Sequence, residues 1–166
     1  MLKEPIYKWK TKSALEKGTK RETISFNEAK TIGFLFDDDT NYKKSKQFIE
    51  SISNEGKTVS VLIKSIEKEP QSEKHFTQKQ CKWHGKIDNE RVIKFINKPF
   101  DYLFLLNENP HYVSEYILAS SIAKCRVGIH NEEKEAFFEL MFDNKQKQPI
   151  DSFYKTVKGY LDKIKS

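Results

Sequence analysis

Cysteine, glycine and long apolar runs are all scarce in this chain of 166 residues. The two cysteines, Cys81 and Cys125, are too few for the disulfide framework of a small secreted domain, so we expect both to be free thiols. No window approaches the roughly 18 uninterrupted apolar residues of a transmembrane helix, and the N-terminal residues contain no apolar stretch like that of a secretory signal. We therefore expect a cytoplasmic protein without a membrane span.

The motifs that define several enzyme classes are also missing. The first apolar run is followed by carboxylates and not by the glycines of a phosphate-binding turn, so the dinucleotide-binding fingerprint is absent. No serine stands in a nucleophile-elbow sequence, and neither cysteine has a comparable context. The sequence therefore predicts no cofactor and no catalytic residue.

Positive charge is present but unevenly placed. The net charge is +6, and residues 1–30 hold eight Lys or Arg against four Glu, which leaves only +2 for the remaining 136 residues. Lysines and arginines that neutralise phosphates release counterions, so this imbalance favours a nucleic acid or an acidic surface as partner. The alternative is a solvated lysine-rich helix that binds nothing.

Hydrophobic periodicity divides the chain into alternating helices and strands. A helix is predicted at 3–17, ended by Gly18 and followed by a polar connector. Beyond residue 30, strands are predicted at 31–36, 58–64, 101–107, 125–130 and 137–143, and helices at 40–54, 88–97, 109–124 and 150–164.

This alternation is typical of a parallel sheet with helices on both faces. The acidic loop at 131–136 is too short for a crossover helix, so the last two strands are predicted to pair antiparallel. We expect a three-layer, Rossmann-like α/β sheet of about five strands, mostly parallel with an antiparallel edge hairpin. It would form one domain at 31–166, preceded by a basic helix and connector at 1–30.

Three consecutive carboxylates, Asp37 to Asp39, follow the first predicted strand. In open α/β sheets this is where ligands bind, and the haloacid-dehalogenase type of phosphotransferase places D-x-D-x-[TV] there. The threonine of "DDDT" stands one residue too early for that motif. Aspartates at a helix start also accept hydrogen bonds from free backbone N–H groups, which is the interpretation we favour. A Mg²⁺ or substrate role is the alternative.

A zinc site is a further alternative, because Cys81 and His84 form a C-x-x-H pair with His75 six residues earlier. A fourth ligand would have to come from a distant part of the chain. The sequence therefore favours no metal site.

The chain shows two resemblances to known families. With "FDYLFLLNENPHYVSEYILASSIAKCRVGIHN", "IGFLFD", "WHGK", "FFELMFD" and "YLDKI", the chain resembles a family of small uncharacterised proteins with a domain of unknown function from one Gram-negative phylum. The first of these stretches is also similar in outline to the N-terminal half of heptosyltransferase-like GT-B glycosyltransferases. The first resemblance implies no activity, and the second implies a fold.

Two hypotheses about function follow. The first is a non-catalytic binding module that docks onto RNA, a ribosome or an acidic protein through its basic N-terminal segment. Its binding residues would be Lys8, Trp9, Lys10, Lys12, Lys17, Lys20 and Arg21. The second is a small enzyme or small-molecule binder, either a degenerate glycosyltransferase or metal-dependent, that uses the crevice at the strand ends. Its residues would be Asp37, Asp39, Asn107, Glu108 and His130.

Overall fold

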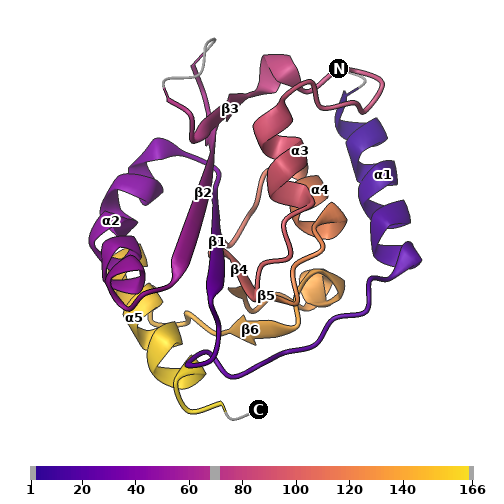
Figure 1. The fold of residues 1–166 in the computed structure, drawn as a ribbon. Coiled ribbons are helices and arrows are strands. Elements are labelled where there is room, and N and C mark those ends of the chain that lie inside the picture. Colours follow the sequence, from indigo (N-terminus) through magenta and orange to yellow (C-terminus); the bar gives the residue numbers. More distant parts are fainter. Residues whose placement is uncertain (1–2, 68–71, 165–166) are drawn as a thin grey trace.

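A six-stranded parallel sheet forms the centre of the protein (Figure 1). The computed structural model describes residues 3–67 and 72–164. The strands are β1 (Thr31–Phe36), β2 (Thr58–Ser65), β3 (His75–Thr77), β4 (Tyr102–Leu105), β5 (Cys125–Ile129) and β6 (Leu140–Phe142). Their order across the sheet is β3-β2-β1-β4-β5-β6, and each neighbouring pair is parallel. This order is compatible with a Rossmann-like fold.

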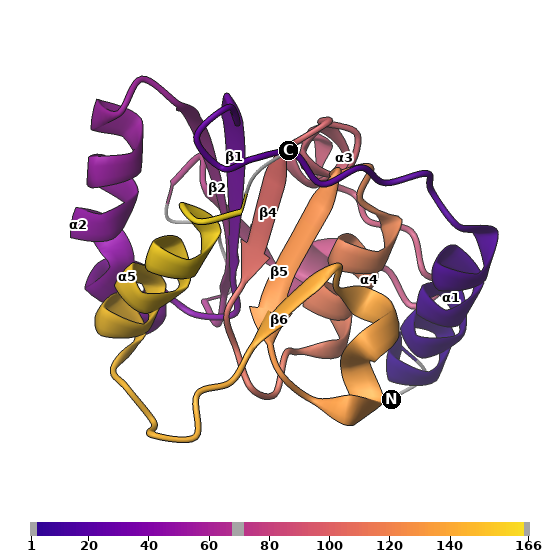
Figure 2. The ribbon, with the colours of Figure 1, turned by 90° about the horizontal axis from the view of Figure 1, so that it is seen from below.

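Helices cover both faces of the sheet (Figures 1 and 2). One face carries α2 (Asp39–Asn54) and α5 (Ile150–Leu161), and the other carries α1 (Lys3–Lys17), α3 (Glu90–Ile96) and α4 (Tyr112–Ser120). Each face has its own hydrophobic core, built on the alternate side chains of the same strands. Within the described residues, no helix combines the length and the apolar character that a membrane crossing needs.

The structure confirms the α/β class, but the strand count and the antiparallel hairpin of our prediction are wrong. β6 begins at Leu140, so ten residues connect it to β5, and six of them coil into a 3₁₀ helix, Glu132–Phe137. That connection returns the chain to the edge where the parallel strands begin, so β6 pairs parallel to β5. The strand that the prediction lacks is β3, which is only three residues long. It pairs with β2 on the side away from β1 and forms one edge of the sheet.

The N-terminal segment packs closely on the sheet. Tyr7 is fully buried between α1 and α4, where its ring lies edge-on to Tyr116. In the connector, Phe26 is buried and the backbone O of Ile24 accepts a hydrogen bond from the Tyr102 hydroxyl. α1 is therefore held on the sheet by its own aromatic anchor and by the segment that follows it.

Asp101 joins the amino ends of β1, β4 and β5. Its carboxylate accepts hydrogen bonds from the backbone N–H groups of Lys30 and Thr31, and it pairs with Lys124 Nζ at 2.8 Å. Burial alone would raise the pKa of this carboxyl, but the bonds from Lys124 and the two N–H groups outweigh it and lower the pKa. The ionised Asp101 carboxylate therefore links the starts of these three strands.

Gly128 lets the β5–β6 connection lie directly on the sheet. A Cβ atom at this position would overlap the ring of Phe138. We expect Gly128→Ala to lower the free energy of unfolding by about 1–3 kcal/mol, because the ring must move. Urea denaturation gives the value.

The matched control is Gly159→Ala, because Gly159 lies in α5 with nothing within 4 Å of an added Cβ. Alanine there should raise stability by about 0.5–1 kcal/mol. Equal effects of the two substitutions would show that Phe138 does not pack on Gly128.

Candidate functional site

The carboxylate of Asp37 lies where the strand order reverses, just beyond the carboxyl end of β1. It accepts hydrogen bonds from Asn107 Nδ2 at 2.9 Å and from the backbone N–H of His111 at 2.7 Å. The buried hydroxyl of Ser114 donates to its other oxygen. Asp37 thus fills the space between β1 and the N-terminus of α4, which is where open α/β sheets place an anionic ligand.

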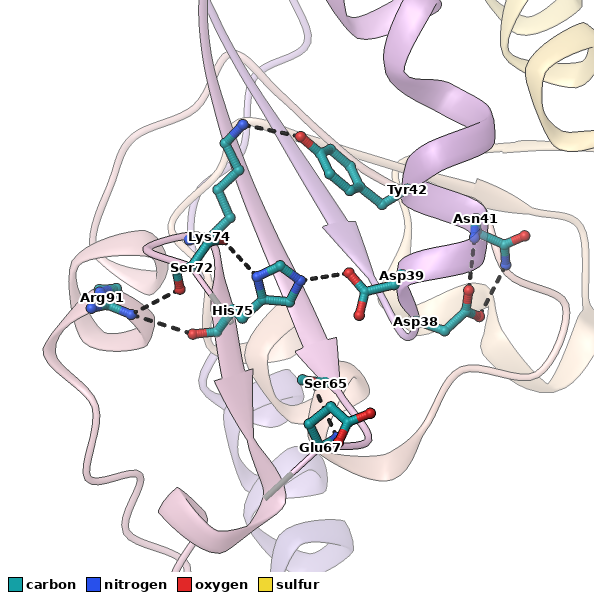
Figure 3. A network of polar contacts seen from close by, with 10 residues as sticks. All are labelled: Asp38, Asp39, Asn41, Tyr42, Ser65, Glu67, Ser72, Lys74, His75 and Arg91. Atoms are coloured by element: carbon teal, nitrogen blue, oxygen red, sulfur yellow. Dashed lines mark hydrogen bonds and ion pairs between the residues drawn. The ribbon is translucent and has the colours of Figure 1, made fainter. Parts of the chain in front are cut away.

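The other two aspartates of the triplet point elsewhere (Figure 3). Asp38 is the N-cap of α2, and its carboxylate accepts the backbone N–H of Asn41 at 2.7 Å. Asp39 is the first residue of α2 and bonds to Nε2 of the buried His75 at 2.5 Å. Each of the three carboxylates therefore has its own protein partner, and Asp38 caps the helix as the sequence predicts.

The residues that were predicted to line the strand-end crevice lie in three separate places. Asp37 and Asn107 are in contact, whereas Asp39 bonds to His75 on the edge strand β3. Glu108 and His130 line a shallow depression of about 340 Å³ beyond the ends of β4, β5 and β6. Within the described part of the chain, no three Asp, Glu, His or Cys side chains lie close enough to hold a metal ion.

Neither cysteine has the environment of a nucleophile. Burial raises the pKa of the Cys81 thiol to about 11 and that of Cys125 to about 12. The protonated thiol therefore predominates at neutral pH in both residues, and both cysteines are free. His75, which the zinc alternative pairs with Cys81, bonds to Asp39 instead.

The basic residues of the N-terminal segment differ in their surroundings. Lys8, Lys12, Lys17 and Lys20 are exposed. Lys10 is half-buried, because its ammonium donates to Gly85 O at 2.6 Å and lies over the ring of Tyr116. Arg21 does not belong to this surface: its guanidinium is buried, donates to Ala123 O and pairs with Glu139.

Two exposed tryptophans lie on segments that contact each other. Trp9 on α1 is 69% exposed, and Trp83 in the loop at 82–86 is 63% exposed. The Tyr7 hydroxyl donates to Lys86 O, and Lys10 donates to Gly85 O, so the loop is fastened to α1 (Figure 1). The sequence drew attention to Trp9, but the placement of Trp83 beside α1 depends on bonds across more than 70 residues.

A groove of about 360 Å³ runs along α1 beside Trp9. Trp9, Lys10 and Lys17 line its α1 side, and Tyr116 and Ser120 line its α4 side. Because α1 carries lysines and an indole while α4 contributes an aromatic ring and a hydroxyl, the groove offers cations, π-faces and hydrogen-bonding groups together.

Comparison with known proteins gives a family but no activity. The model of a family described as "Family of unknown function (DUF6913)" matches residues 3–164, and the chain belongs to this family. No curated protein and no solved structure matches the chain significantly. The expected family of unknown function is thus confirmed, whereas its phylum and the similarity to heptosyltransferase-like enzymes stay predictions.

The bonds of Asp37 and Asp38 predict different costs for removing each carboxylate. Asp37→Ala leaves three donors without an acceptor and should lower the free energy of unfolding by about 3 kcal/mol or more. Asp38→Ala removes one helix cap and should cost about 1 kcal/mol. Urea denaturation tests the order, and a cost for Asp38→Ala equal to or larger than that for Asp37→Ala contradicts it.

His111 should make the protein less stable in mild acid. Burial and the nearby Lys64 lower its pKa, against the smaller opposing effect of Asp37, and its neutral Nδ1 accepts the backbone N–H of Val113 at the start of α4. The unfolded chain therefore binds a proton more readily than the folded one. The contribution of neutral His111 to the free energy of unfolding is complete above the pKa of about 6.5 that histidine has in the unfolded chain. It is lost as the pH falls below that value.

Urea denaturation between pH 8 and pH 5 measures this loss. In His111→Asn, whose amide oxygen can still cap α4, the slope of stability against pH between about 6.5 and 5.5 should be smaller than in the parent chain. An unchanged slope would assign the effect to another group.

Proposed function

We propose that the protein is a binding module for single-stranded RNA that uses the exposed side of α1 and the adjoining loop. This binding face consists of Trp9, Trp83 and the exposed lysines Lys8, Lys12, Lys17 and Lys20. The observation that carries the proposal is the pair of exposed indoles on two segments that are bonded together. Single strands are bound by aromatic rings on which bases stack, within a positively charged surface.

The charges on the binding face are free to meet phosphates. Within the described residues, Lys12, Lys17 and Lys20 form no ion pair, and Lys8 pairs only with the exposed Glu4. Lys12 and Lys17 follow Trp9 by three and eight residues, which places them on either side of Trp9, at about 60° and about 80° around the helix. A backbone that tracks along α1 would place phosphates beside these lysines and a base over Trp9.

The indoles are held on a firm support. α1 is anchored by the fully buried Tyr7, and the loop that carries Trp83 is bonded to the same helix turn. A base that stacks on Trp9 therefore meets a ring whose backbone is already ordered, so binding costs less conformational entropy. Unpaired bases fit this face better than a duplex, because only splayed bases expose their π-faces.

The strand-end crevice offers less support for a ligand. Asp37 already occupies the anion position at α4, and its charge would repel a phosphate. An acidic protein remains the other candidate for the basic face, and it would need the lysines without needing the indoles.

Charge reversal tests the electrostatic part of the proposal. The double variant Lys12→Glu, Lys17→Glu should bind a fluorescein-labelled single-stranded RNA 12-mer more weakly. The slope of log K against log salt concentration should become shallower by about 0.7 per lost phosphate contact. The matched control is Lys43→Glu with Lys44→Glu, two exposed lysines of α2 on the opposite face of the sheet. Fluorescence anisotropy at several salt concentrations gives both values. Equal losses in the two double variants would mean that the α1 face is not the site.

Trp9→Ala tests stacking. We expect affinity for the same RNA to fall by about 1–3 kcal/mol, with no comparable loss for a poly-glutamate peptide, because only the RNA has bases to stack. Tyr160→Ala, which removes an exposed ring from α5, is the control. If Trp9→Ala leaves RNA affinity unchanged, or if poly-glutamate binds more tightly than the RNA, the proposal fails and an acidic partner is favoured.

A further inference from the structure

Three side chains at the β3 edge of the sheet form a continuous hydrogen-bonded line (Figure 3). Ser72 Oγ lies 2.6 Å from His75 Nδ1, and His75 Nε2 lies 2.5 Å from Asp39 Oδ1. Ser72 is exposed, the His75 side chain is buried, and Asp39 lies between the two in exposure. The line thus runs from an exposed serine through a buried histidine to a partly exposed aspartate.

The hydrogen bonds fix the tautomer of the imidazole. A carboxylate can only accept, so Asp39 requires the proton of His75 to be on Nε2. Nδ1 is then an acceptor, and it faces the hydroxyl of Ser72. Asp39 stands in the first turn of α2, where the helix dipole stabilises its negative charge.

From this geometry we infer that Ser72 is a nucleophile for small, accessible carboxylic esters, with His75 as its general base and Asp39 as the group that orients the imidazole. Such a constellation is recognised by geometry and roles, and here the serine faces Nδ1 where serine proteases use Nε2. The activity is independent of the RNA-binding face, because the two share no residue.

The reaction balances without any cofactor. Ser72 Oγ forms a bond to the ester carbonyl carbon while its proton moves to His75 Nδ1. The C–O bond to the leaving alcohol then breaks, and the alcohol oxygen takes the proton from Nδ1. Water repeats the sequence on the acyl-serine, releasing the carboxylic acid and restoring Ser72.

One guanidinium and one backbone N–H group lie beside the nucleophile. The guanidinium of Arg91 lies 3.3 Å from Ser72 O and 3.5 Å from His75 O, with further donors exposed to solvent. The backbone N–H of Lys74 donates to Ser72 Oγ at 3.2 Å and holds the hydroxyl in place. In the proposed reaction, the remaining N–H groups of Arg91 stabilise the negative oxygen that forms when the carbonyl is attacked.

The test is covalent labelling of the full chain with a fluorophosphonate probe, followed by intact mass and peptide mapping. The serine displaces fluoride, so a functional site acquires one phosphonyl group at Ser72. His75→Gln should slow labelling by about 100-fold, and Asp39→Asn should slow it as well. Hydrolysis of p-nitrophenyl acetate by the same variants reports turnover.

Ser72→Ala separates a catalytic role from a structural one, because Ser72 is exposed and its removal should leave the melting temperature nearly unchanged. It should abolish the adduct and the ester hydrolysis, whereas Ser53→Ala, at an exposed serine of α2, should change neither. No adduct at Ser72 in the parent chain, or equal labelling of the parent and Ser72→Ala, would overturn the inference.

Discussion

The hydrogen bonds to the Asp37 carboxylate organise the strand-end edge of this protein. They tie the end of β1 to the connection after β4 and to the start of α4, across the point where the strand order reverses. In nucleotide-binding α/β proteins, a helix N-terminus at this edge of the sheet holds a phosphate. Here the scaffold supplies the negative charge itself, so this edge is stabilised from within and is poorly suited to an anionic ligand.

The groups available for binding or reaction therefore lie at the α1 face and at the β3 edge of the sheet. On one side, Tyr7 fastens α1 to the sheet, and the Lys10 and Tyr7 bonds draw in the loop that carries Trp83. At the β3 edge, Asp39 turns away from its two neighbours and orients His75. The three consecutive aspartates therefore serve three different tasks, because successive residues at a strand-to-helix turn point in different directions.

Local sequence patterns were sufficient for the β1–α2–β2 unit, where apolar periodicity and Gly56 define the elements within a few residues. They were also sufficient for α1, whose end is marked by Gly18. The predicted strand at 137–143 begins three residues before β6, so the connection from β5 looks too short for a parallel strand. In the structure Phe137 ends the 3₁₀ helix and Phe138 packs on Gly128. Partners of Asp37 and Asp39 were beyond prediction, since they lie 36 to 77 residues away in the chain.

We propose that a ligand binds at the α1 face and not at the strand-end edge. The chain has only two tryptophans, so an NMR spectrum shows two indole N–H signals, from Trp9 and Trp83. Titration with a single-stranded RNA 12-mer should shift both indole signals and leave the amide signals of Asn107 and Ser114 in place. Shifts at Asn107 and Ser114 with unmoved indoles would contradict the account.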